Sequence, residues 1–139
     1  RLYSSLTGAI LESAAPIADT ARALSEIDLT TGFADLARAE GWAQPNVDDS
    51  RNFEITGGRH PVVEAALRKT GEPFIANDCA LSNGDDHAHI WLLTGPNMAG
   101  KSTFLRQNAL IALLAQTGSF VPATNAHIGM ISQLFSQRG

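Results

Sequence analysis

One short stretch carries more structural information than any other part of this 139-residue chain: Gly95-Pro96-Asn97-Met98-Ala99-Gly100-Lys101-Ser102. It fits the pattern G-x-x-x-x-G-K-[ST], which is typical of a phosphate-binding loop. In such a loop the glycines adopt backbone conformations that a Cβ would forbid, so successive N–H groups point toward a bound anion. The lysine adds a full positive charge, and the hydroxyl group that follows it is placed to bind Mg²⁺.

The residues on either side of the loop support this interpretation. The apolar run Ile90–Leu93 leads into Gly95 and has the length and hydrophobicity of a buried strand. Ser102–Gln116 has the pattern of a helix, and we expect its apolar second half, from Leu110 onward, to be buried. This order places a phosphate group at the N-terminus of the helix. It disfavours the alternative of a simple glycine turn in which Lys101 and Ser102 only cap the helix.

The first forty residues predict two amphipathic helices. Leu2, Leu6 and Ile10 begin one apolar stripe, and Pro16 marks a bend or the start of a new helix. A second pattern runs from about Asp19 to Glu40, and Gly41 is well placed to cap its end. The next residues, 44–52, are polar and rich in turn formers, which indicates a connector. We therefore expect a helical segment over residues 1–43, a connector over 44–52 and a second domain over 53–139.

The second domain alternates short β-like runs with helices. Phe53–Thr56 is the first such run, and we expect Gly57-Gly58 to break it. Val62–Arg68 predicts a short helix, and we expect His60 just before it to hydrogen-bond to the backbone and fix the end of the strand. Phe74–Leu81 is a further strand-like or loop segment, and we expect another strand region over Ala126–Phe135. The sequence therefore predicts an α/β fold.

Composition and charge exclude several classes of protein. Ten Lys and Arg residues against fourteen Asp and Glu give a net charge of −4, which excludes a strongly basic nucleic-acid-binding arm within these residues. The single cysteine, Cys79, cannot form an internal disulfide, so nothing indicates secretion, and we expect it to be a small buried apolar residue. No apolar run approaches the roughly 20 residues that span a bilayer. Because the chain starts at Arg1 and stops just after a strand-like run, we expect both ends to be cut from a longer protein.

Four blocks of the chain together resemble one family. Thr94–Gln107 closely resembles the nucleotide-binding segment of the MutS family of DNA mismatch-repair ATPases. Gly58–Glu64, Phe74–Asp78 and Gly118–Ala123 resemble three further blocks of that family in the same order. Residues 1–43 look like the last helices of the family's lever and core region, so the resemblance covers essentially the whole chain. The residues that favour the mismatch-repair branch over a related paralogue are Met98, Lys101, Ser102 and Thr103.

The resemblance implies a fold and a set of ligand contacts. The fold would be part of a P-loop NTPase domain of the ABC type, preceded by two helices of a helical domain. Phe74 and Ile75 would hold the adenine of ATP, with the Phe74 ring stacked on the base, and Asn77 would contact the base or the ribose. The alternative for Phe74 is a plain core aromatic. Ser102 would bind Mg²⁺, and the ATP phosphates would be bound by Gly95, Pro96, Asn97, Met98, Ala99, Gly100, Lys101, Ser102 and Thr103.

The resemblance also implies a biological role. ATP binding and hydrolysis would be coupled to the clamp state on mismatched double-stranded DNA, in a homodimer of the full-length protein. Its further partners would be downstream mismatch-repair factors, and its location the bacterial cytoplasm, on DNA. No apolar run ending in an acidic pair follows the loop within these 139 residues, so we expect no catalytic residue in the chain itself.

Two alternatives stay open on the sequence. The chain is a truncated nucleotide-binding fragment with no hydrolysis or repair activity of its own, or it is a different P-loop enzyme such as a small kinase. The Pro96-Asn97-Met98 loop and the lack of an acceptor-site pattern disfavour the kinase.

Overall fold

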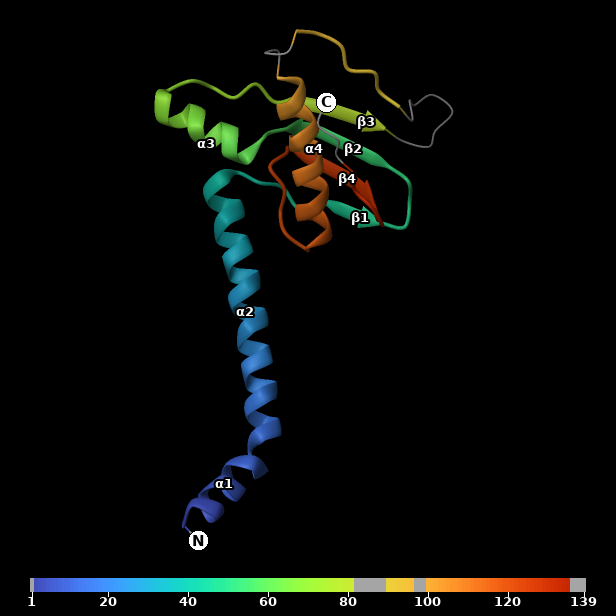
Figure 1. The fold of residues 1–139 in the computed structure, drawn as a ribbon. Coiled ribbons are helices and arrows are strands. Elements are labelled where there is room, and N and C mark those ends of the chain that lie inside the picture. The colour runs from blue at the N-terminus through green and yellow to red at the C-terminus, as the bar shows by residue number, and fades with distance from the viewer. Residues whose placement is uncertain (1, 82–89, 97–99, 136–139) are drawn as a thin grey trace. The chain divides into compact units, whose positions relative to one another are not determined.

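The structure is a computed structural model that describes residues 2–81, 90–96 and 100–135 (Figure 1). The chain divides into two compact units, Arg1–Asp35 and Leu36–Gly139. The first unit contains α1 (Leu2–Glu12) and most of α2 (Ala14–Glu40), which confirms the two predicted helices. Pro16 lies in the first turn of α2, where a proline removes no helical hydrogen bond.

The apolar side chains of the first unit are exposed. Among the described residues before Ala37 none is buried, and Leu2, Leu6 and Leu24 are each more than half exposed. None of the helices in the described part of the chain is both long and apolar enough to cross a membrane. At its other end, α2 is followed by Gly41, whose φ of 61° agrees with the predicted cap.

The second unit is built around a four-stranded mixed sheet with the strand order β1-β4-β2-β3. β4 pairs in parallel with β1 and antiparallel with β2, and β2 pairs antiparallel with β3. α4 lies against the sheet (Figure 1). The strands and helices of this unit are β1 (Asn46–Asp48), β2 (Phe53–Gly58), α3 (Pro61–Thr70), β3 (Asn77–Leu81), α4 (Lys101–Gln116) and β4 (Asn125–Gly129).

The core lies between α4 and the sheet. Ile111 on α4 packs in one cluster with Ile55 of β2 and Ile128 of β4, and all three are at most 2% exposed. This confirms the expectation of a buried second half of α4, although Leu113 remains 49% exposed. Cys79 belongs to the same cluster, and burial raises the pKa of its thiol to about 11, as expected for a small buried residue.

α3 is capped at both ends. The N–H of Val63 donates to Nδ1 of the buried His60 at 3.5 Å, which confirms the expected backbone role of this histidine. Burial lowers the pKa of His60, which favours the neutral ring that can accept this bond. Gly71 ends the helix, and its N–H donates to the carbonyl of Arg68 at 3.3 Å.

Two sequence predictions of local structure are wrong. Gly57-Gly58 does not break the first strand, because β2 continues through both residues with an irregular register. Gly57 has a φ of 61°, and a Cβ there would collide with the side chain of Thr124, so glycine permits the strand to continue. The expected connector over 44–52 also contains a short strand, β1, which forms because β4 lies beside it as a parallel partner. The strand expected over Ala126–Phe135 ends at Gly129.

The strand predicted over Ile90–Leu93 is also wrong. A strand needs a neighbouring backbone to bond to, and none of the four described strands pairs with these residues. Their exposure nevertheless alternates: Ile90 and Leu92 are 85% and 88% exposed, whereas Trp91 and Leu93 are 40% and 36% exposed. Period-two patterning is therefore present, but the hydrogen-bonded ladder is absent from the described part of the chain.

A short side-chain contact joins β1 to β4 within the sheet. Oδ2 of Asp48 lies 2.8 Å from Nε2 of His127 on β4, and Oδ1 of Asp48 accepts the N–H of Ser50 at 3.0 Å. Hydrogen bonds from Ser50 and His127 hold the pKa of Asp48 at about 2, below its usual 3.8.

We predict that Asp48→Asn makes the free energy of unfolding less dependent on pH between about pH 4 and about pH 2. The Asp48 carboxylate contributes stability that is full above its unfolded pKa and is lost as the pH falls from about 4 to about 2. Urea midpoints measured across this range should fall less steeply for Asp48→Asn than for the wild type. Parallel slopes would contradict the account.

We predict that Ile111→Ala lowers the free energy of unfolding by about 2–5 kcal/mol, because it leaves a cavity between α4 and the sheet. Leu113→Ala removes a similar side chain two residues away that is half exposed, and it should cost well under half as much. Urea unfolding of both variants measures the difference. Equal costs would show that α4 does not pack through Ile111.

Candidate functional site

A groove of about 750 Å³ opens in the second unit. Val63 and Leu67 of α3 form one wall, and residues of the segment 73–78 form the next. The other walls come from the segment 91–94 and from the first turn of α4, Gly100–Phe104. The volume lies within the range of small-molecule and cofactor sites, and the lining combines apolar side chains with a few polar groups.

The groove brings two distant sets of predicted site residues together. Phe74, Ile75 and Asn77 line it on one side, and Gly100, Lys101 and Thr103 line it on the other. Gly95, Pro96 and Ser102 are described but do not line the groove, and Asn97, Met98 and Ala99 lie outside the described residues.

The aromatic end of the groove is open to a flat ligand. Phe74 is half-buried, whereas Ile75 is 81% exposed and presents an unpacked aliphatic side chain. The side-chain amide of Asn77 donates to the carbonyl of Ile75 at 3.0 Å, which fixes the turn between these residues. An aromatic ring with an adjacent aliphatic group is chemically suited to a planar base.

The opposite end of the groove is suited to an anion. Gly100 is the N-cap of α4 and has a φ of 83°, a left-handed conformation that glycine adopts without strain. Gly100 has no side chain that could cap α4, and the first N–H groups of a helix have no partner within the helix. The positive end of the helix dipole therefore lies at this end of the groove. The first turn also has no acidic residue that would repel an anion.

Lys101 adds a charge at the same place. Its ammonium Nζ donates to the carbonyl of Gly95 at 2.5 Å, so the lysine bridges the first and last parts of the glycine-rich loop. The positive charge and the free N–H groups together make this end a candidate phosphate site.

Two parts of the groove lining were not predicted from the sequence: the side chains of α3 and those of the apolar run Ile90–Leu93. Trp91 lines the groove and stacks on Phe104, with ring centroids 6.2 Å apart and planes 2° apart. Val63 and Leu67, four residues apart on one face of α3, complete the wall. The available signal was this i, i+4 spacing, but only the tertiary structure shows which surface it faces.

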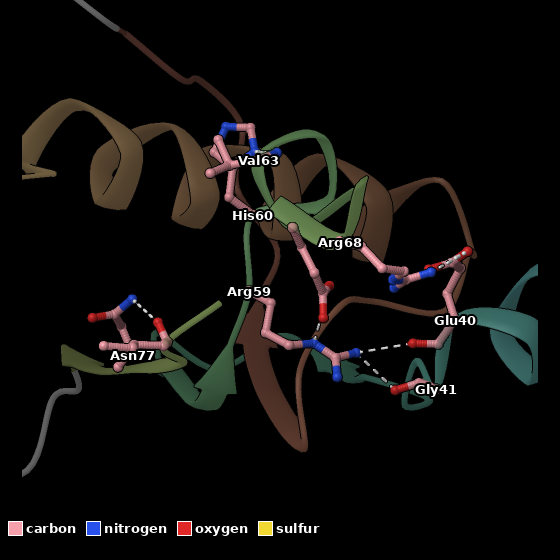
Figure 2. A network of polar contacts seen from close by, with 9 residues as sticks. Glu40, Gly41, Arg59, His60, Val63, Arg68 and Asn77 are labelled. Atoms are coloured by element: carbon pink, nitrogen blue, oxygen red, sulfur yellow. Dashed lines mark hydrogen bonds and ion pairs between the residues drawn. The ribbon is translucent and has the colours of Figure 1, made fainter. Parts of the chain in front are cut away.

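A polar network beside α3 was also missed (Figure 2). Nη2 of Arg59 donates to the carbonyl of Glu40 at 3.1 Å and to that of Gly41 at 2.9 Å. Nη2 of Arg68 lies 2.9 Å from Oε2 of Glu40, and Nε of Arg59 lies 3.5 Å from Oε2 of Glu64. The hydrogen bond from Arg68 lowers the pKa of Glu40, and the same bond raises the pKa of Arg68.

Comparison with known proteins relates this geometry to one family. The family profile described as MutS domain V matches residues 91–139, which include the loop, α4 and β4. The DNA mismatch repair protein MutS of Ruegeria sp. is 69% identical over 140 residues, which cover 100% of this chain and 16% of that protein. The MutS protein of Paracoccus denitrificans is 66% identical over 138 residues, or 99% of this chain and 16% of that protein.

The chain thus spans about 16% of the length of the relatives it matches. The similarity extends over nearly the whole chain, helices α1 and α2 included, and its domain V match contains the predicted phosphate-binding residues. The chain therefore belongs to the MutS family and includes part of the family's domain V.

Proposed function

We propose that the groove binds ATP with Mg²⁺, with the adenine at Phe74 and Ile75 and the phosphates at the start of α4. The observation that carries this proposal is that a single groove is lined by both Phe74 and Lys101, although 26 residues of chain separate them. The membership in the MutS family supports it.

Each group of residues would contact a different part of the ligand. The N–H groups of the first turn of α4 and the ammonium of Lys101 would hold the phosphate oxygens, and Thr103 would contact the α-phosphate. Residues Gly95–Gly100 would enclose the phosphates, and the Ser102 hydroxyl would hold Mg²⁺, which neutralises phosphate charge when bound. Asn77 would contact the base or the ribose, since its side chain lies at the aromatic end of the groove.

We further propose the role of the longer protein from which this sequence derives. The relatives carry the name DNA mismatch repair protein, and in such a protein ATP binding and hydrolysis would be coupled to a clamp on mismatched DNA. The protein would act as a homodimer with downstream repair factors in the bacterial cytoplasm. Residues 1–43 would belong to its lever and core helices, 44–52 to a connector, and 53–139 to a P-loop ATPase domain of the ABC type.

A second candidate function is nucleotide binding without hydrolysis. Among the described residues that line the groove, Asp78 is the only carboxylate, and its Oδ1 already accepts the N–H of Gly57 at 2.7 Å. Hydrolysis needs a group that positions the attacking water, and a carboxylate engaged in a backbone bond is poorly placed for it. ATP turnover by this chain that disappears in Lys101→Ala would exclude this candidate.

We predict that Lys101→Ala weakens Mg–ATP binding by at least about tenfold, because it removes the full charge at the phosphate end. Calorimetric titration measures the affinity. Lys69→Ala is the matched control, since it removes a lysine at the far end of α3 that does not line the groove, and it should leave the affinity unchanged. Equal affinities for the wild type and Lys101→Ala would refute the phosphate site.

We predict that Phe74→Ala weakens ATP binding roughly 5- to 150-fold, since stacking of a base on an aromatic ring contributes about 1–3 kcal/mol. Inorganic triphosphate has no base, and its affinity for the same variant should stay at the wild-type value. The ratio of the two affinities is the measurement. A variant that loses both ligands equally would show that Phe74 is a core aromatic instead.

A further inference from the structure

α3 touches two different parts of the second unit with two different faces. Val63 and Leu67 line the proposed nucleotide groove. Val62 and Ala66, on another face, line a separate cavity of about 540 Å³ together with Leu36 of α2 and Trp42. α3 therefore contributes side chains both to the groove and to the cavity at the C-terminal end of α2.

Charged contacts connect α3 to the end of α2. The last carbonyls of a helix lack helical partners and carry the negative end of its dipole. Arg59, just before α3, donates to the carbonyls of Glu40 and Gly41, and Glu64 in the first turn of α3 lies beside the same guanidinium. Arg68 in the last turn of α3 bonds to the carboxylate of Glu40. Both ends of α3 are thus linked to the final turn of α2.

α3 is otherwise weakly anchored. None of its ten residues is buried, and it takes no part in the sheet. An element with few buried contacts is displaced at a lower free-energy cost than a core element. A ligand that contacts Val63 and Leu67 can therefore displace α3. The charged contacts connect this helix to α2.

We propose that α3 couples nucleotide occupancy of the groove to the last turn of α2, and that the contacts among Glu40, Arg59, Glu64 and Arg68 are the connection. The inference rests on the proposed nucleotide site and names the route by which that site is linked to α2. Coupling between two sites is reciprocal, so a change at the end of α2 also changes the affinity of the groove for its ligand. Arg68 is in this account a positioning residue that acts through Glu40.

Hydrogen exchange tests the route directly, because two backbone amides report on the end of α2. The N–H of Trp42 donates to the carbonyl of Ala37 at 2.9 Å, and the N–H of Ala43 donates to that of Val121 at 3.0 Å. In the wild-type chain, saturating Mg–ATP should change the exchange rates of these two amides. It should at the same time protect the amides of Lys101–Phe104 at the phosphate end.

Arg68→Gln is the informative variant, with Lys69→Gln as its matched control. Both remove one positive charge from the last turn of α3, but in the described structure only Arg68 pairs with Glu40. The pair is partly exposed, so Arg68→Gln should reduce the exchange response at Trp42 and Ala43 on the order of two- to fivefold. Protection at Lys101–Phe104 should persist, and Lys69→Gln should retain the full response.

Three outcomes would overturn the proposal, and they are distinguishable from one another. Protection at Lys101–Phe104 with no change at Trp42 and Ala43 would refute the coupling and leave the nucleotide site intact. Equal responses of Arg68→Gln and Lys69→Gln would refute the connection through Glu40. No protection at Lys101–Phe104 in the wild type would refute the nucleotide site, and the coupling with it.

Discussion

The packing of α4 against the sheet is the constraint on which the site depends. Ile111 and Ala115 on α4 are fixed against Ile55 and Ile128, in a cluster that excludes water almost completely. Close packing of this kind sets both the position and the direction of a helix axis. Because the far end of α4 is held in the core, its N-terminus is held at the groove, where the free N–H groups and Lys101 are presented.

The chemistry of the groove follows from this placement. The positive end of the α4 dipole and the N–H groups of its first turn favour an anion at this end of the groove. Phe74 and Ile75 lie at the other end of the same groove, at a site that an aromatic base suits and a phosphate does not. Under the proposed function, a nucleoside triphosphate would place its planar base at the first end and its phosphates at the second.

Structural features that depend on short-range sequence patterns were predicted well. The helices α1, α2, α3 and α4 follow from periodicity and from the turn residues at their ends, because these signals act within a few residues. The role of His60 as a backbone partner was predictable for the same reason. The spacing of glycines, lysine and serine in the loop is also a local signal, and it predicted the end of the groove to which we assign the phosphates.

The missed features depend on contacts between distant parts of the chain. β1 exists because β4 lies beside it, although the two are separated by about eighty residues, and nothing local in Asn46–Asp48 indicates a strand. The segment Ile90–Leu93 has the composition of a strand, but the described residues offer it no partner. The Arg68–Glu40 pair joins residues 28 apart on two different helices, a relation that neither periodicity nor spacing encodes.

The most direct test of the central claim is a set of intermolecular NOEs between Mg–ATP and the isotope-labelled chain, recorded together with amide shift changes. We expect NOEs from the adenine H2 or H8 proton to the ring of Phe74, and in the same complex shift changes at the amides of Lys101, Ser102 and Thr103. Shift changes at the phosphate end without any contact between the base and Phe74 would contradict a single groove that binds both ends of the nucleotide.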